Sequence, residues 1–179
     1  MSPYRKQLRR IEAPGHARYL TCSCYHRLGL LGNPAIRDAF AGQLERVHQR
    51  NAFRLLAWVV MPDHVHLVLM PNLPHWTVPK ILHAIKRPFA QRVIARWREL
   101  NAVVLGRLRD RSGVTRFWQR GGGYDRNIIS DDELLEKIGY MHANPVRRGL
   151  ADCPVDWIWS SAPWYAGMHD GPVRIDPVV

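Results

Sequence analysis

The chain of 179 residues has few cysteines and no long apolar run. Cys22, Cys24 and Cys153 form no even disulfide framework, and the Cys-x-Cys pair lacks the second pair of a zinc site. No stretch of 18 apolar residues predicts a membrane span, and the polar, basic start has no apolar stretch of the kind a secretion signal carries. We therefore expect a reduced, cytoplasmic protein that makes no membrane contact.

Internal repeats and low-complexity segments are also missing from the sequence. Hydrophobic residues make up 46% and charged residues 23%, which is typical of a globular chain and excludes a wholly disordered one. The length suits one domain over residues 1–179. We expect a core of about 15–165, a polar basic N-terminal extension and a C-terminal tail.

Lysine is scarce, with 4 residues against 22 arginines, yet the chain carries a net charge of +11. Residues 1–126 hold 22 basic and 7 acidic side chains, whereas residues 127–179 hold 4 and 8. A GC-rich genome would explain the preference for arginine but not the excess of positive charge. Because arginine matches phosphate oxygens two at a time, the first two-thirds of the chain is predicted to bind a polyanion.

The apolar spacing predicts a β-α-β-β-α-β order followed by another helix. Strands are expected at 18–26, 53–61, 65–70 and 117–120, and helices at 34–50, 78–100 and 130–143. Pro88 predicts a kink or interruption in the second helix, glycines 121–123 predict a turn, and Ser130 begins a capping box. The order is that of an α+β, ferredoxin-like (RRM-like) antiparallel sheet with helices on one face, plus a C-terminal helix.

His64 and His66 lie two positions apart on one predicted strand. Residues at this spacing on a strand share a face, so both imidazoles point the same way. Two imidazoles on one face make half of a metal site, which needs a third ligand from elsewhere. The alternative is two polar residues on an ordinary sheet face.

Tyr140 lies away from the apolar stripe of the last helix, which is predicted to comprise Leu134, Leu135, Ile138, Met141 and His142. Lys137, Asn144 and Arg147 fall near Tyr140 on the polar side. This placement would let the tyrosine hydroxyl meet a phosphate, and the alternative is an ordinary surface tyrosine. Pro145 is expected to distort the spacing between Tyr140 and Asn144.

Taken together, these motifs resemble the REP-associated tyrosine transposases, the single-tyrosine HUH family. The segments that carry the resemblance are Met61-Pro62-Asp63-His64-Val65-His66, Lys86, Phe117-Trp118-Gln119-Arg120, Tyr124-Asp125, the stretch from Tyr140 to Leu150, and Trp159-Ser160-Ser161. Arg126 departs from the family pattern, in which histidine is expected after the Tyr-Asp pair.

The resemblance implies a catalytic site and a reaction. His64 and His66 become the metal-binding pair, Asn144 the third ligand and Tyr140 the nucleophile. A divalent ion, Mg²⁺ or Mn²⁺, would orient the scissile phosphate, and cleavage of single-stranded DNA next to a hairpin would leave a 5′-phosphotyrosine. The protein would then be a transposase that cleaves and rejoins DNA.

Arginine and lysine side chains around this site are expected to contact the DNA backbone. The long basic helix supplies several of them, two flank the glycine run, and one follows Tyr140; the set is Lys86, Arg87, Arg92, Arg120, Arg126 and Arg147. The expected partner is a REP-like single-stranded hairpin. We expect a monomer, with a dimer as the alternative.

Two other functions fit the same residues. One is a phosphoesterase or nuclease that uses water in place of tyrosine. The other is a hairpin-binding protein that has lost catalysis or serves a domesticated role. A covalent protein–DNA adduct would separate both from a tyrosine transposase.

The charge distribution predicts strongly salt-dependent binding to DNA. If the basic part of the chain neutralises six to ten phosphates, affinity for a single-stranded hairpin should fall by roughly 10³-fold or more between 50 and 200 mM salt. A fluorescence-anisotropy titration at several salt concentrations measures this slope. A nearly flat dependence would contradict a surface that follows the DNA backbone.

Overall fold

The computed structural model describes residues 15–121 and 123–178. The predicted N-terminal extension therefore lies largely outside the described residues. The strands are β1 (Arg18–Ser23), β2 (Phe53–Val60), β3 (His64–Pro71) and β4 (Tyr124–Asn127), and the longer helices are α1 (Pro34–His48), α2 (Val78–Glu99) and α3 (Asp131–Arg147). Short helical turns follow at Tyr25–Arg27, Val103–Arg107, Pro154–Asp156 and, as α4, at Ala162–Tyr165.

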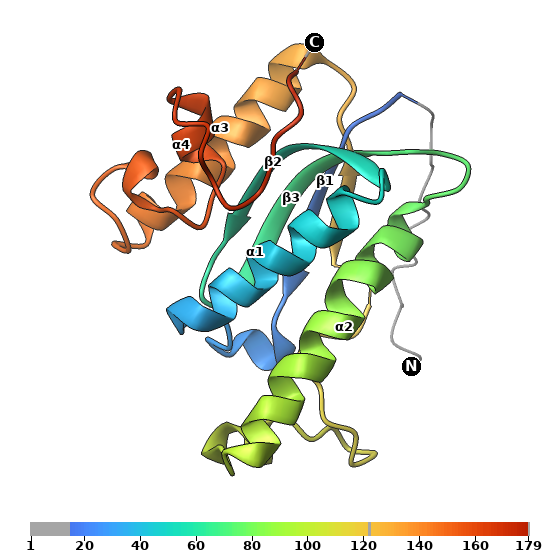
Figure 1. Cartoon of the computed structure of the whole chain (residues 1–179), viewed down its shortest axis with the longest axis vertical. Helices are drawn as coiled ribbons and strands as arrows, with labels where there is room; N and C mark the ends of the chain where they lie inside the picture. Colours follow the sequence, from blue (N-terminus) through green and yellow to red (C-terminus); the bar gives the residue numbers. More distant parts are fainter. Residues whose placement is uncertain (1–14, 122, 179) are drawn as a thin grey trace, which may run out of the picture.

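The four strands form one antiparallel sheet in the order β2-β3-β1-β4, which confirms the ferredoxin-like fold. Helices α1 and α2 lie together over one face of this sheet, and α3 lies on the other side (Figure 1). Within the described ranges, no helix is long and apolar enough to span a bilayer.

Alternation along the strands builds a separate core on each face. Leu20, Val65 and Leu67 belong to the cluster shared with α1 and α2, whereas Tyr19 and Val68 belong to the cluster beneath α3. Since side chains two positions apart share a face, His64 and His66 have the orientation of Val68. The histidine pair therefore lies on the α3 side of the sheet.

The fourth strand is not where the sequence predicted it. Phe117 and Trp118 are consecutive, yet both are buried in the cluster under α2, with ring centroids 5.1 and 5.8 Å from that of Phe89. Neighbouring strand residues point to opposite faces, so this packing excludes a regular strand at 117–120. The sheet is completed instead by β4, which pairs with β1.

Helix α2 is not interrupted at Pro88. Proline lacks an N–H, so the carbonyl of Ala84, one turn earlier, loses its helical donor. The side-chain amide of Gln43 on α1 donates to that oxygen at 2.9 Å and replaces the missing bond. An interhelical contact thus allows a continuous helix of 22 residues.

Helix α3 begins as predicted, because the Ser130 hydroxyl accepts a hydrogen bond from the backbone N–H of Glu133. It continues through Pro145 to Arg147, so Asn144 follows Tyr140 by one regular turn. Leu135 was predicted in the buried stripe but is 58% exposed. His142 on the same stripe is buried, and it contacts Ser161 and Tyr165 of the C-terminal segment.

Residues after the predicted core also pack against the domain. Val173 and Ile175 are buried in the cluster on the α1 and α2 side. The Asp176 carboxylate accepts from the backbone N–H of Leu55 at 2.7 Å and lies 2.8 Å from His48 Nε2. The C-terminal tail is therefore part of the folded structure.

His142 predicts an acid-side loss of stability. Burial lowers its pKa to about 4, while its Nε2 lies 2.8 Å from the Ser161 hydroxyl. As pH falls below about 6.5, His142 binds a proton in the unfolded chain but not in the folded protein, so the free energy of unfolding decreases. From pH 7 to pH 5 this residue should account for about 1–2 kcal/mol of that decrease.

Urea unfolding of the native protein and His142→Gln at the two pH values tests this prediction. The variant should lose less stability than the native protein over this interval, because glutamine does not titrate. Equal losses in both proteins would contradict it. Burial also lowers the pKa of His66, so the variant should keep part of the pH dependence.

Candidate active site

The imidazoles of His64 and His66 converge on the sheet face under α3. Their Nε2 atoms are 3.0 Å apart and their ring planes are nearly perpendicular, at 82°. Both side chains are buried. In the sheet, His66 lies opposite Thr21 of β1 and Val59 of β2.

Asp63 fixes the outer side of the His64 ring. The His64 Nδ1 atom lies 2.7 Å from Asp63 Oδ1. The same carboxylate is 3.2 Å from the Arg27 guanidinium and 3.4 Å from that of Arg148, which follows α3 directly. This network connects the start of β3 to the end of the helix that carries Tyr140.

Two hydroxyl groups of β1 contact the outer side of the His66 ring. The Thr21 hydroxyl is 2.8 Å and the Tyr19 hydroxyl 3.0 Å from His66 Nδ1. Burial, reinforced by the neighbouring His64, lowers the pKa of His66 to about 3, and burial also lowers the pKa of His64. Both rings are therefore neutral at pH 7, as metal-ligating imidazoles must be.

Tyr140 is 47% exposed on α3, although most large hydrophobic side chains of this helix are buried. The guanidinium of Arg147 lies 5.0 Å from the centre of its ring. Burial is the main cause of the raised pKa of Tyr19, and the proximity of Tyr140 is the second cause. The Tyr19 hydroxyl contacts His66. Tyr140 therefore lies near Tyr19, and Tyr19 in turn contacts His66 of the histidine pair.

Asn144 has an incompletely satisfied side chain. Its Nδ2 atom is buried and has no hydrogen-bond partner among the described residues. This N–H group can donate to an acceptor such as a phosphate oxygen, whereas only the amide oxygen of Asn144 could bind a cation. Asn144 lies one turn after Tyr140 on α3.

The donor set fits a small divalent cation. Two ligands at right angles and about 2.1 Å from one ion are about 3.0 Å apart, which matches the two Nε2 atoms. Nowhere in residues 15–121 and 123–178 does a cluster of three His, Cys, Asp or Glu side chains occur that could hold a metal. A third protein ligand would therefore come from a group such as the Asn144 amide.

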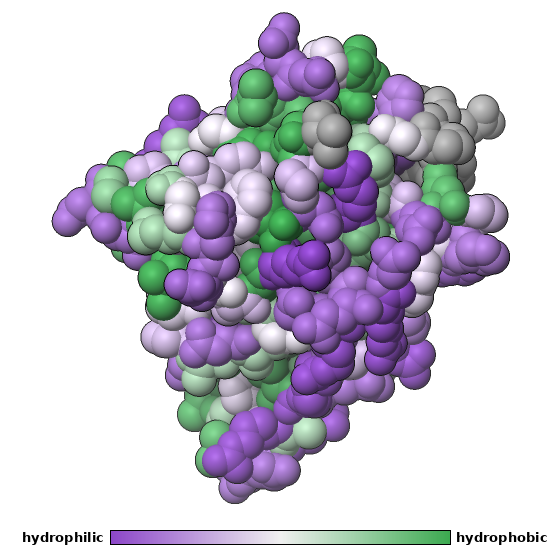
Figure 2. All heavy atoms as spheres, turned by 45° about the horizontal axis from the view of Figure 1, so that its top comes forward, coloured by the Kyte–Doolittle hydropathy of each residue, from purple (hydrophilic) through white to green (hydrophobic). Residues whose placement is uncertain are grey.

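The predicted DNA-binding residues do not form one cluster. Lys86 and Arg87 line a groove of about 540 Å³ between α2 and residues 115–121, where the Lys86 ammonium lies 5.5 Å from the Trp118 ring centre. Arg92 donates to Gln43 on the surface formed by α1 and α2. Along α2 the exposed side chains form a hydrophilic band (Figure 2).

The remaining predicted contacts lie nearer the end of the chain. Arg120 is exposed next to the end of the groove at Gly121. Arg126 of β4 forms an ion pair with Glu133 of α3 at 2.8 Å. Together with Arg147 beside Tyr140, Arg126 places cations on the α3 side, across the sheet from Lys86, Arg87 and Arg92.

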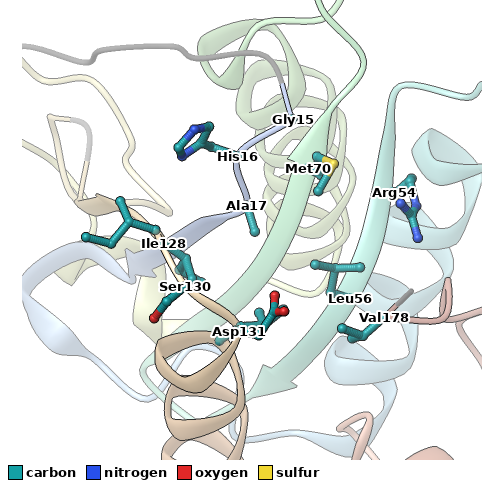
Figure 3. Close-up of a pocket in the computed structure, with 12 residues that line it drawn as sticks. Gly15, His16, Ala17, Arg54, Leu56, Met70, Ile128, Ser130, Asp131 and Val178 are labelled. Carbon is teal, nitrogen blue, oxygen red and sulfur yellow. The ribbon is translucent and has the colours of Figure 1, made fainter.

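A smaller hollow lies on the α3 side of the sheet, away from the histidine pair. It has a volume of about 270 Å³ and lies between the start of α3, the start of β2 and the end of β3, where Asp131, Arg54 and Met70 line it (Figure 3). Met70 lies six residues along β3 from His64, which is about 20 Å on an extended strand. None of the predicted site residues lines this hollow.

The sequence did not single out the residues that orient the histidines. The sequence analysis assigned no role at the site to Tyr19, Thr21, Asp63 or Arg148. Two features of the sequence could have indicated these residues: the Asp63-His64 dipeptide, and the spacing of Tyr19 and Thr21, which places both on one face of a strand. Register could have placed these two opposite His66, but register requires the folded sheet.

Comparison with known proteins identifies the class to which this fold and site belong. The family model described as "Transposase IS200 like" matches residues 16–132, which is most of the chain. The chain belongs to this family of transposases, enzymes that act on DNA. The matched region contains His64 and His66 and ends before Tyr140.

Two individual proteins are similar to the chain in sequence. The chain is 25% identical over 126 residues to a REP-associated tyrosine transposase of Haemophilus influenzae, covering 69% of this chain and 67% of that protein. It is 24% identical over 116 residues to a REP-associated tyrosine transposase of Escherichia coli, covering 65% of this chain and 58% of that one.

A solved structure has the same fold along the whole chain. It is a REP-associated tyrosine transposase bound to a REP hairpin, with a TM-score of 0.68 and 20% sequence identity. The alignment covers 100% of this chain and 94% of the other.

Proposed function

We propose that this protein cleaves and rejoins single-stranded DNA next to hairpins through a 5′-phosphotyrosine on Tyr140, with a Mg²⁺ or Mn²⁺ ion held by His64, His66 and Asn144. The observation that carries this proposal is the convergence of the two histidine Nε2 atoms, 3.0 Å apart, beneath the helix that bears the half-exposed Tyr140. Membership in a transposase family supports DNA as the substrate.

Tyr140 is the proposed nucleophile. Its phenolic oxygen forms a bond to the scissile phosphorus, the bond from phosphorus to the 3′ oxygen breaks, and the departing oxygen takes up a proton as the phenol loses one. Arg147, whose guanidinium lies 5.0 Å from the centre of the ring, is placed to bind the phosphate. Because the ester conserves the bond energy, attack by a 3′ hydroxyl rejoins DNA without ATP.

The divalent ion would offset charge on the scissile phosphate and fix its orientation. The protein side chains prepare this site: Asp63 orients the His64 ring, and the hydroxyls of Tyr19 and Thr21 orient His66. Asn144 contributes its amide oxygen from the same face of α3 that presents Tyr140. The phosphate is thus positioned by β3 and attacked from α3.

The proposed substrate is a REP-like hairpin with adjoining single-stranded DNA. The relatives named above and the hairpin-bound structure support this choice. The basic helix α2 and the groove containing Lys86 and Arg87 offer a surface for the DNA backbone. We propose that the chain acts as one domain and as a monomer.

Replacing either ligating histidine should separate binding from cleavage. His64→Ala or His66→Ala should abolish cleavage of a labelled hairpin in Mn²⁺ while leaving affinity for that hairpin within about threefold, since binding depends on many phosphate contacts. Gel assays of cleavage and anisotropy measurements of binding are made on the same variants. Full cleavage by both variants would contradict the metal assignment.

Tyr140→Phe tests the nucleophile directly. The change removes one oxygen and keeps the ring, so hairpin affinity should change little while the covalent adduct disappears. Intact-mass spectrometry and denaturing gels should detect an adduct on the peptide containing Tyr140 in the native protein alone. Tyr124→Phe is the matched control, because Tyr124 is similarly exposed at 50% and should leave the adduct in place.

The outcomes separate the competing functions. Cleavage by Tyr140→Phe at the native rate would indicate a nuclease that uses water. Tight hairpin binding by the native protein with no cleavage and no adduct would indicate a binding protein that has lost catalysis. Either result overturns the proposed chemistry.

A further inference from the structure

Two arginines from distant parts of the chain converge on Asp63. Arg27 follows β1, and its Nε lies 3.2 Å from Asp63 Oδ2. Arg148 follows α3, and one of its terminal nitrogens lies 3.4 Å from Asp63 Oδ1. The same Oδ1 atom is 2.7 Å from His64 Nδ1. Both guanidinium groups therefore lie beside the histidine pair, on the Nδ1 side of the His64 ring and away from its Nε2 atom.

The Asp63 carboxylate offsets only one of the two positive charges that meet there. Arg27 donates in addition to the uncharged hydroxyl of Ser23 at 3.0 Å. The Arg148 guanidinium has no other hydrogen-bond acceptor in the described part of the chain. Because each guanidinium has five N–H donors, several donors of this pair remain free to bind an anion.

Both guanidinium groups are open to solvent. The side chains of Arg27 and Arg148 are 54% and 47% exposed, whereas that of Asp63 is only 11% exposed. Ion pairs as exposed as these contribute little to the stability of a fold. Arginine is also the side chain whose planar fork best matches two phosphate oxygens. The arrangement therefore suits the binding of a phosphate better than the stabilisation of the domain.

The backbone around Arg27 has an unusual conformation that places this side chain beside Asp63. His26 and Arg27 have φ angles of 51° and 56°, in the left-handed region that residues other than glycine rarely adopt. Hydrogen bonds hold the segment: the His26 N–H donates to the Gln119 side-chain oxygen at 3.1 Å, and the Cys24 N–H donates to the Asp63 carbonyl at 2.8 Å. Backbone held in a rare conformation by its surroundings is typical of functional sites.

Two consecutive arginines at the end of α3 contact different parts of the site. The Arg147 guanidinium lies 5.0 Å from the centre of the Tyr140 ring, whereas Arg148 contacts Asp63 in the turn before β3. A scissile phosphate between Tyr140 and the histidine Nε2 atoms would lie on the Arg147 side. A DNA strand that continues past the His64 ring would then bring its next phosphates to Arg148 and Arg27.

We infer that Arg27 and Arg148 together bind one backbone phosphate of the single-stranded DNA, separate from the scissile phosphate and on the Asp63 side of the histidine pair. Asp63 aligns the two guanidinium groups, and their outward N–H donors bind the non-bridging oxygens of that phosphate. Neither arginine belongs to the predicted DNA-binding set. The inference rests on the proposed function, because that function makes single-stranded DNA the partner.

The first test neutralises the DNA phosphates one at a time. A labelled hairpin with single-stranded flanks, taken from beside the gene of this protein, carries an uncharged methylphosphonate at each flank position in turn. Anisotropy measures affinity in a chelator, so that no DNA is cleaved. At one position the native protein should lose affinity about tenfold, and Arg27→Gln combined with Arg148→Gln should show no such loss. Absence of any such position, or its occurrence only in the duplex stem, would overturn the inference.

The second test is the salt dependence of binding to the unmodified hairpin. The double variant should reduce the slope of log affinity against log salt by about 0.7, the value for one phosphate of a single strand. An unchanged slope, or a reduction of about 1.4 that indicates two phosphates, would contradict a shared phosphate. Arg50→Gln combined with Arg174→Gln is the matched control, since it removes two exposed charges at the end of α1 and in the C-terminal tail. This control should keep the methylphosphonate pattern of the native protein.

Thermal unfolding shows whether the compared proteins are folded. The double variant should unfold within about 4 °C of the native protein, because exposed ion pairs contribute little to stability. If it does not fold, Arg148→Gln alone serves for the same comparison and should remove most of the loss at the identified phosphate; an undiminished loss would overturn the inference.

This inference and the proposed chemistry can fail separately. Loss of the methylphosphonate effect in the double variant supports the phosphate site even if no Tyr140 adduct forms. An adduct on Tyr140 together with an unchanged methylphosphonate effect in the double variant overturns the phosphate site and leaves the proposed chemistry in place.

Discussion

The pairing of β1 with β3 is the constraint on which the candidate site depends. Its register places Thr21 directly opposite His66. Tyr19, two residues before Thr21 and opposite Val68, lies on the same face of the sheet. A slip of one residue would turn the histidines into the apolar cluster under α1 and α2, and would bury Val65 and Leu67 on the wrong side. The apolar cores on both faces therefore fix the geometry of two imidazoles.

Much of this arrangement could be predicted from the sequence. Strict alternation identified the face of His64 and His66, and helical spacing identified Tyr140 as a residue outside the buried stripe of α3. Both predictions rest on local periodicity, which a single chain displays directly. The predicted order of strands and helices then led to the ferredoxin-like topology, because few sheet topologies are compatible with that order.

The predictions that were wrong involve contacts between distant segments. Pro88 was expected to kink or interrupt α2, but the helix is not interrupted, and the side-chain amide of Gln43 on α1 donates to the carbonyl that proline leaves without a donor. Residues 117–120 have the composition of a strand, yet Phe117 and Trp118 are drawn into the aromatic cluster around Phe89. Leu135 matches the buried stripe, but nothing in the described chain buries it as His142 is buried. No local pattern encodes these partners.

The sheet and the tyrosine helix are joined by residues that lie beyond the matched family region. The Ser161 hydroxyl accepts from the Trp58 backbone N–H on β2 and contacts His142 on α3, and the Trp157 indole N–H donates to the Val60 carbonyl. Arg148 adds an ion pair from the end of α3 to Asp63. Leu134, Ile138 and Met141 of α3 already pack on this face of the sheet. The later contacts add polar links between the sheet and the helix, so the C-terminal segment helps to hold Tyr140 on the same face as the histidine pair.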